Sequence, residues 1–235
     1  MSFDKSWENN IYTKNKHINR YPYGELISVF FNSLKFLQTD NKKLKLLELG
    51  CGCGNNLWFF AENGFDTFGI DGSNSACKIA KQLCEDRNIN ATILNATFDS
   101  LPFEDNTFDI IIDREATYCG KYTDIKQWWQ EASRVLKKGG LVISFRFSEY
   151  SPDLLEIKKG ILNAKMIESN TYYDIKKGTF KDTGIVHFTK YEEIFEIFNF
   201  CNIKYIKRVF GEILYCNKCE NSYQSDEYII VGVKE

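Results

Sequence analysis

Three glycines and one acidic residue give this 235-residue chain its clearest chemical signature. In the stretch LLELGCGCGNN, Glu48 ends an apolar run, and Gly50, Gly52 and Gly54 follow at every second position. Glycine accepts positive φ, and without a Cβ it lets a ligand approach the main chain. The amphipathic run that follows predicts a helix whose first N–H groups are free to bind a polar ligand. We interpret the stretch as a strand, turn and helix that cradle a nucleotide-like cofactor. A tight turn without a ligand is the alternative.

A second acidic position follows the next apolar run, in the sequence Asp71-Gly72-Ser73. Asp71 lies roughly 20 residues beyond the first glycine, at the tip of the neighbouring predicted strand, where a carboxylate can accept both hydroxyl protons of a ribose. The alternative is that Asp71 only caps the following helix. Because Ser73 caps that helix equally well, we favour the ribose interpretation.

Charged residues also follow the apolar run over residues 108–112, which is typical of a central parallel strand buried on both faces. They are Asp113, Arg114 and Glu115. Ligands of open α/β sheets bind outside the carboxyl ends of the strands, so this triplet occupies a functional position. A solvated loop explains three consecutive charges equally well.

The order of apolar patterns predicts alternating strands and helices in one α/β domain. We expect helices over residues 24–37, 55–63 and 123–138, a strand over 141–145, a helix within 152–168, and a capping box at Thr189. The last two strands, over 203–210 and 226–233, are expected to form a hairpin. These expected elements divide the chain into four segments. Residues 1–40 are expected to form an N-terminal arm or lid with a helix, and residues 41–145 a cofactor-binding core. Residues 146–186 are expected to form an insertion over the site, and residues 187–235 a C-terminal helix with two strands.

Composition narrows the class of partner. The formal charge is -2, with 30 basic and 32 acidic residues, which gives no excess that favours nucleic acid or an acidic membrane. Eight scattered cysteines and a polar N-terminus indicate the reducing cytoplasm with free thiols. No apolar run approaches the ~20 residues that span a bilayer. Cys216 and Cys219 supply only two of the four ligands of a structural zinc, so we expect no metal.

Four features in this order resemble the class I S-adenosylmethionine-dependent methyltransferases, in particular the small-molecule branch called type 11. They are the spaced glycines after Glu48, Asp71 at a strand tip, Leu101-Pro102-Phe103 before the fourth strand, and the run 134–140 before the fifth. The resemblance implies a Rossmann-like sheet of seven strands, six parallel and the last antiparallel, with helices on both faces. It implies S-adenosylmethionine as cofactor and S-adenosylhomocysteine as product.

The resemblance also assigns residues to the cofactor. The glycine loop would take the methionine moiety, Asp71 the ribose, and Thr97 with Phe98 the adenine. Relatives often carry Asp where this chain has Thr97, but a hydroxyl can still accept from the adenine amino group. In the arm, Arg20 would meet the methionine carboxylate and Tyr12 the sulfonium. The full implied set is Glu48, Gly50, Cys51, Gly52, Gly54, Asp71, Gly72, Thr97, Phe98, Arg114, Tyr12 and Arg20.

Methyl transfer requires mainly that an oxygen or nitrogen nucleophile be held opposite the sulfonium with water excluded. A hydroxyl acceptor also needs a base. The candidates are Glu115, His187 and His17, the first two ranked above the third, and for each a purely structural role is the alternative. We expect a small polar acceptor such as a sugar or sugar nucleotide, no nucleic acid or membrane partner, and a monomer or homodimer. An NAD-dependent oxidoreductase and a non-catalytic cofactor-binding protein are the competing functions.

Overall fold

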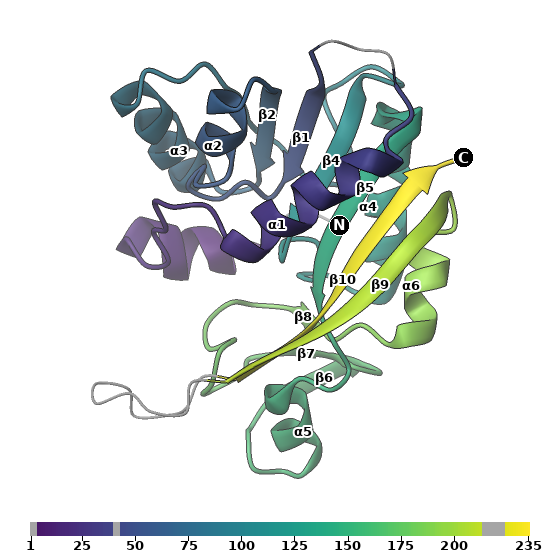
Figure 1. Ribbon diagram of the computed structural model, residues 1–235. Helices are drawn as coiled ribbons and strands as arrows, with labels where there is room; N and C mark the ends of the chain where they lie inside the picture. Colours follow the sequence, from purple (N-terminus) through teal and green to yellow (C-terminus); the bar gives the residue numbers. More distant parts are fainter. Residues whose placement is uncertain (1–3, 40–42, 213–223) are drawn as a thin grey trace.

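A seven-stranded sheet runs through the computed structural model of the chain, which describes residues 4–39, 43–212 and 224–235 (Figure 1). Its strand order is β3-β2-β1-β4-β5-β10-β9. The strands are β1 (Lys45–Leu49), β2 (Asp66–Asp71), β3 (Thr92–Asn95), β4 (Phe108–Arg114), β5 (Leu136–Phe147), β9 (Cys201–Glu212) and β10 (Gln224–Lys234). β10 pairs antiparallel with both β5 and β9, so it alone runs against the other six. The expected sheet of six parallel strands and one antiparallel last strand is confirmed. Cys216 and Cys219 lie outside the described residues.

Helices cover both faces of this sheet. They are α1 (Gly24–Ser33), α2 (Leu57–Glu62), α3 (Asn74–Asp86), α4 (Tyr122–Val135) and α6 (Tyr191–Ile197). Alternate residues of a strand point to opposite faces, and neighbouring β4 residues accordingly enter different cores. Ile111 packs with Trp129 of α4 and Ile194 of α6, whereas Ile110 packs with Phe30 of α1. Both faces of β4 are therefore buried, which explains its three consecutive isoleucines at 110–112.

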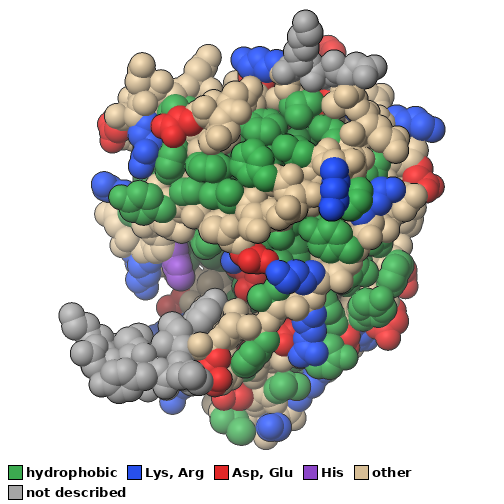
Figure 2. All heavy atoms as spheres, in the orientation of Figure 1, with side chains coloured by type: hydrophobic (Ala, Val, Ile, Leu, Met, Phe, Trp, Pro, Cys, Tyr) green, Lys and Arg blue, Asp and Glu red, His purple; other side chains and the backbone are tan. Residues whose placement is uncertain are grey.

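Hydrophobic side chains gather on the face of the molecule that α1 crosses (Figure 2). On α1 itself, Leu26 and Phe30 are fully buried, while Phe31 remains 42% exposed. Short helical turns at Trp7–Ile11, Tyr12–Lys14 and Leu34–Phe36 flank this helix. Across the described part of the chain, no helix has the length and apolar character needed to cross a membrane.

Residues 146–186 contribute a short helix and most of a small second sheet. The elements are α5 (Pro152–Lys158), β6 (Lys165–Glu168), β7 (Thr171–Tyr173) and β8 (Val186–His187). The helix expected within 152–168 therefore ends early, because Gly160 adopts φ +73° and the following residues pair as a hairpin. A separate apolar cluster, which includes Phe147, Phe180 and Phe188, joins this segment to the main sheet.

Several predicted helix boundaries were wrong, among them the end of α1, which is at Ser33 and not at residue 37, the end of α4 and the start of α6. α4 ends at Val135, not Lys138, because Leu136 already pairs with Phe108 of β4 in the sheet. α6 begins after Lys190, whose backbone N–H donates to the Glu193 carboxylate at 2.8 Å. The expected cap, Thr189, is instead buried and accepts a hydrogen bond from another part of the fold.

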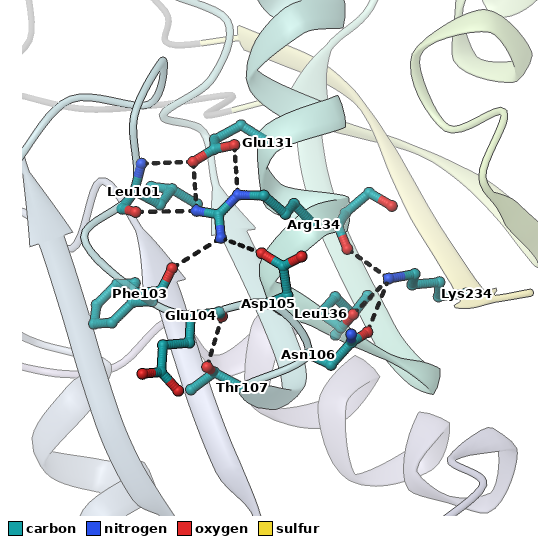
Figure 3. A network of polar contacts seen from close by, with 11 residues as sticks. Leu101, Phe103, Glu104, Asp105, Asn106, Thr107, Glu131, Arg134, Leu136 and Lys234 are labelled. Atoms are coloured by element: carbon teal, nitrogen blue, oxygen red, sulfur yellow. Dashed lines mark hydrogen bonds and ion pairs between the residues drawn. The ribbon is translucent and has the colours of Figure 1, made fainter.

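Arg134 joins two of the sequence motifs that lie far apart in the chain (Figure 3). Its guanidinium donates to the carbonyl oxygens of Leu101 and Phe103 and to the carboxylates of Asp105 and Glu131. Glu131 also accepts the backbone N–H of Leu101 at 2.9 Å. These hydrogen bonds connect the loop before β4 to the last turn of α4. The Leu101-Pro102-Phe103 motif and the motif at 134–140 therefore both have a structural role.

A buried polar network fixes the loop that follows β4. Asp113 is fully buried and accepts the backbone N–H groups of Ala116 and Thr117, as well as the hydroxyls of Thr117 and Ser144. Arg146 of β5, equally buried, lies 3.8 Å from the Asp113 carboxylate and donates to the Thr117 hydroxyl. These bonds hold residues 114–117 in one conformation.

We expect Asp113→Ala to lower the free energy of unfolding by about 3 to 5 kcal/mol, because it leaves the Arg146 charge buried without its carboxylate. Urea denaturation of the purified protein measures this loss. The matched control is Glu25→Ala, which breaks the exposed pair with Lys207 and should cost no more than about 1 kcal/mol. Equal stability of the two variants would contradict the structural role assigned to Asp113.

Candidate functional site

Three adjoining hollows lie along the carboxyl ends of β1, β2, β3 and β4. We call them the loop cavity, beside Gly50 and Glu115; the middle hollow, beside Asp71; and the outer hollow, beside Thr97. Gly50 and Glu115 line both the loop cavity and the middle hollow, and Gly72 and Phe98 line both the middle and outer hollows. At about 320 Å³, the loop cavity is the largest of the three. One extended ligand can therefore follow all three.

Two of the three glycines are needed where the turn approaches its neighbours. Gly50 has φ +65°, and a Cβ there would lie 2.2 Å from the Cβ of Ala116. Gly52 has φ +50°, and its Cβ would lie 2.9 Å from the Tyr12 hydroxyl. Gly54 differs from the predicted role, because its Cβ would meet Ala80 of α3 at 3.0 Å. It serves helix packing and is not among the residues lining the hollows.

Glu48 lines the loop cavity and carries a buried oxygen that has no hydrogen-bond partner among the described residues. The residue is 2% exposed, and its Oε1 accepts from the Asn56 side chain at 2.6 Å. Its Oε2 has no hydrogen-bond partner among the described residues. Burial raises the pKa of Glu48 to about 8, with the Asn56 hydrogen bond opposing that rise. A buried acceptor without a partner is costly in free energy and marks a position for a ligand donor.

Asp71 joins the turn after β1 to the turn after β2. Its Oδ2 accepts the Gly52 N–H at 2.9 Å, and its Oδ1 accepts the Ser73 N–H at 2.8 Å. Burial raises its pKa to about 6 although both N–H groups favour the ionised form. The predicted alternative, a helix cap, falls to Ser73, whose hydroxyl accepts the Ala76 N–H at 3.0 Å. Asp71 lines the middle hollow.

The outer hollow contains the residues expected to contact a base. Thr97 and Phe98 both line it, and the Phe98 ring packs against Trp128 with centroids 5.3 Å apart. Asp99, which the sequence did not single out, lines the same hollow. A carboxylate acceptor is therefore present two residues beyond the expected position, beside the Thr97 hydroxyl.

Arg114 and Glu115, at the end of β4, line the loop cavity, and Glu227 of β10 lies beside Arg114. Arg114 forms an ion pair with Glu115, and its Nη2 lies 3.8 Å from Glu227 of β10. The guanidinium stacks against Tyr23 and Phe145, at 4.4 and 5.0 Å from the ring centres. Glu115 has φ +53°, and burial, opposed by Arg114 and reinforced by Glu227, raises its pKa to about 8. Non-glycine residues held in this conformation cluster at functional sites.

The N-terminal arm crosses the site. Trp7 and Tyr12 line the loop cavity and the middle hollow, and His17 lines the loop cavity. Glu8 secures the arm by accepting the hydroxyl and backbone N–H of Ser75, at 2.7 and 3.1 Å. Arg20, however, is not among the residues that line the three hollows. It lines a further hollow against α3, which shares Asn19 and Cys53 with the loop cavity.

His187 is not where the sequence led us to expect it. The ring is fully buried, with Nδ1 2.7 Å from the Thr171 hydroxyl and Nε2 3.0 Å from the Glu193 carboxylate. It stacks on Tyr122 and is absent from the residues that line the three hollows. Its hydrogen bonds connect β8 to β7 and α6, which is a structural role.

Five further residues that line the loop cavity were not predicted from the sequence. They are Tyr118, Phe147, Thr179, Phe180 and Thr183. Their contact depends on the packing of residues 146–186, which no sequence period predicts. Glu227 was also missed, but a signal existed. Because β10 runs antiparallel, acidic residues at its start lie at the same sheet edge as the carboxyl ends of the other strands.

The described residues form no ligand set of a metal site. Among residues 4–39, 43–212 and 224–235, no group of three or more His, Cys, Asp and Glu side chains is arranged to hold a metal ion. The six described cysteines carry free thiols. Burial raises the pKa of Cys53, at the loop cavity, to about 11, so its thiol stays protonated at neutral pH.

Residues 46–140 match a family model described as a methyltransferase domain. An uncharacterized methyltransferase of Bacillus subtilis, YcgJ, is 29% identical over 97 residues, 41% of this chain and 38% of that protein. The tRNA N(3)-methylcytidine methyltransferase Mettl2 of Drosophila melanogaster is 26% identical over 200 residues, 80% of this chain and 58% of that protein. The chain thus spans less than two thirds of the length of both relatives.

The fold is also found among solved structures. A SAM-dependent methyltransferase from Methanosarcina mazei superposes with a TM-score of 0.68 at 19% sequence identity. The match covers 91% of this chain and 98% of that one. At this level of identity, the similarity establishes the shared fold.

The buried carboxyl of Glu48 makes stability depend on pH. Its pKa is raised in the folded state, so its contribution to stability is complete below about pH 4.5 and is lost as the pH rises through about 8. We expect Glu48→Gln to have a free energy of unfolding roughly 5 kcal/mol above that of the wild type at pH 9, and to differ little at pH 4.5. Thermal unfolding at the two pH values measures this difference. The control is Glu62→Gln on the exposed side of α2, which should show no such trend. A pH-independent difference for Glu48→Gln would contradict the assignment.

Proposed function

We propose that this chain is a class I S-adenosylmethionine-dependent methyltransferase that transfers a methyl group from that cofactor to an oxygen or nitrogen atom of a small polar metabolite. The observation that carries this proposal is the free Oε2 of Glu48 beside a glycine turn with no room for a Cβ. This combination suits a ligand that offers an ammonium group close to the main chain.

The loop cavity fits the methionine end of the cofactor. We assign the ammonium group to Glu48 Oε2, since this buried oxygen has no donor in the described protein. We assign the carboxylate to Arg114, whose Nε has no hydrogen-bond acceptor there. Arg114 thereby takes the role that the sequence suggested for Arg20. Tyr12, whose hydroxyl faces Gly52, lies at the junction with the middle hollow and suits contact with the sulfonium.

The middle and outer hollows fit the nucleoside. Asp71 and Gly72 line the middle hollow, where the Asp71 carboxylate has lone pairs left for ribose hydroxyls beyond its two backbone bonds. In the outer hollow, we assign the adenine amino group to Asp99 or Thr97 and the ring to the neighbourhood of Phe98. Cys51 completes the glycine turn as a small residue, with its backbone N–H bonded to Ile70 of β2.

The bound cofactor supplies an activated methyl group with its own leaving group. The protein has to orient the acceptor, exclude water and accept a proton. The aromatic wall of Tyr118, Phe147 and Phe180 serves water exclusion. Glu115 is our candidate base because it lines both the loop cavity and the middle hollow, and His17 is the second candidate.

We infer a small acceptor because the chain is close to neutral and the loop cavity is bounded by the arm and residues 179–183. Residues 146–186 then act as the cover on the acceptor side. A sugar or sugar nucleotide is one acceptor within this class. The tRNA substrate belongs to the Drosophila relative, and the balance of 30 basic and 32 acidic residues argues against nucleic acid here. We propose a cytoplasmic monomer or homodimer.

Replacing Gly50 tests the cradle. Gly50→Ala forces a methyl group into Ala116 in a backbone conformation that disfavours side chains, at a cost of about 1 to 3 kcal/mol. We expect the affinity for S-adenosylhomocysteine, measured by isothermal titration calorimetry, to fall at least about tenfold. Gly64→Ala is the control, because Gly64 has φ +89° but nothing within 4 Å of its Cβ. Wild-type affinity in Gly50→Ala would contradict the role of Gly50 in cofactor binding.

Methyl transfer itself is tested by incubating the protein with S-adenosylmethionine and fractionated metabolites, and by detecting mass gains of one methyl group.

We expect Asp71→Asn to weaken cofactor binding by about 1.5 to 3 kcal/mol, because it loses a charge-assisted acceptor for the ribose. The control is Asp66→Asn, at the opposite end of the same strand. If both variants bind S-adenosylhomocysteine like the wild type, Asp71 only connects the two turns.

A further inference from the structure

The end of β4 holds one cation between two carboxyl groups. Arg114 contacts Glu115 through Nη1 and lies 3.8 Å from Glu227 through Nη2. All three side chains are largely buried, with exposed fractions of 14%, 18% and 11%. With both carboxyls ionised, this buried group carries one excess negative charge.

One of the two carboxyl groups belongs to a residue that lines the loop cavity. This residue is Glu115, and its buried Oε1 has no hydrogen-bond partner among the described residues. Buried charges are stable only when they are paired. The protein resolves the imbalance by keeping a proton, since burial and Glu227 raise the pKa of Glu115 to about 8. A cation entering the cavity would resolve it equally well.

Aromatic residues that line the same cavity suit the same kind of ligand. The rings of Tyr118, Phe147 and Phe180 pack edge to face, with centroids 4.6 to 5.9 Å apart. Trp7 of the arm lines the same cavity. Aromatic faces attract cations, most strongly where water is excluded. A cavity lined by both a carboxyl group and aromatic rings suits an ammonium ion.

From the juxtaposition of Glu115, its charge partners Arg114 and Glu227, and the aromatic wall, we propose that the methyl acceptor is an amine, bound as its ammonium ion against the Glu115 carboxylate. This proposal rests on the proposed function and narrows its acceptor from oxygen or nitrogen to nitrogen. Glu115 is then a catalytic residue, and Glu227 is a positioning residue that acts through Arg114 and Glu115.

The chemical step balances without another reactant. The acceptor ammonium transfers a proton to the Glu115 carboxylate, which leaves a neutral amine with a lone pair. That lone pair forms the new C–N bond as the C–S bond of S-adenosylmethionine breaks, and the bonding electrons stay on sulfur. The products are the N-methylated ammonium ion and neutral-sulfur S-adenosylhomocysteine, and Glu115 returns its proton to water.

Several charged or titratable groups face Glu115 from other elements. Arg114 favours its ionised form, whereas Glu227 of β10 opposes it. Tyr118 lies close enough for its own pKa to respond to Glu115. Glu48 and His17 line the same cavity. Since only the carboxylate accepts a proton, the rate should increase as the pH rises through about 8.

The test uses the 235-residue protein, S-adenosylmethionine and two acceptor pools with matched carbon skeletons, one of primary amines and one of the corresponding alcohols. We expect methyl incorporation into the amine pool at least about tenfold above the alcohol pool. For an amine that reacts, Glu115→Gln should lower kcat/KM at least about 100-fold while the Kd for S-adenosylhomocysteine changes less than about threefold. Glu227→Gln should move the rise in rate to lower pH, because it removes the neighbouring negative charge. Glu192→Gln, on the exposed side of α6, is the matched control.

Methylation of alcohols alone, or of neither pool by protein that binds S-adenosylhomocysteine, would overturn the amine proposal. Full activity in Glu115→Gln would also overturn it. Should that variant fail to fold, the comparison of the two pools with wild-type protein still decides. Failure of the wild type to bind S-adenosylhomocysteine would instead overturn the proposed function.

Discussion

The close approach of Gly50 to Ala116 is the constraint on which the candidate site depends. A left-handed glycine lets the turn after β1 lie against the loop after β4, with no space for a single extra carbon. Ala116 cannot move aside easily, because its N–H is bonded to Asp113, which is buried beside Arg146. The position of Gly50 in the lining of the loop cavity is therefore fixed by the contact between the turn after β1 and the loop after β4. The buried ion pair of Asp113 and Arg146 supports this contact.

The site is assembled at a cost in stability. Burial raises the pKa values of Glu48, Asp71 and Glu115, so each carboxyl disfavours the folded state once it ionises. Such groups persist where a ligand supplies the missing partner. Burial of aromatic side chains in the core offsets this loss of stability. Phe30, Phe60 and the other fully buried rings contribute favourable free energy of folding.

The sheet could be predicted from sequence because its signals are local. Apolar runs, glycine turns and the acidic residue at the tip of β2 lie close together in the chain, and their order determines a doubly wound topology. The cofactor side of the site follows from that topology. The role of Gly54 was not predicted correctly. Gly54 packs against Ala80, and the spacing of the glycines does not indicate this contact.

The acceptor side could not be predicted because its residues meet only through tertiary packing. Phe147 and Phe180 are brought together by the fold of residues 146–186, and Glu227 reaches Arg114 across β5. The two histidines illustrate the limit of reasoning from residue type. His17 lines the loop cavity, whereas His187 is satisfied by Thr171 and Glu193 in the core.

Isothermal titration calorimetry of the purified wild-type protein tests the central claim most directly, with S-adenosylhomocysteine and NAD titrated separately under the same conditions. Both ligands carry a ribose that Asp71 could bind, but only the first offers an ammonium group to the free oxygen of Glu48. We expect saturable binding of S-adenosylhomocysteine and no binding of NAD. Saturable binding of NAD with no heat from S-adenosylhomocysteine would contradict the assignment of this site to a methyl donor.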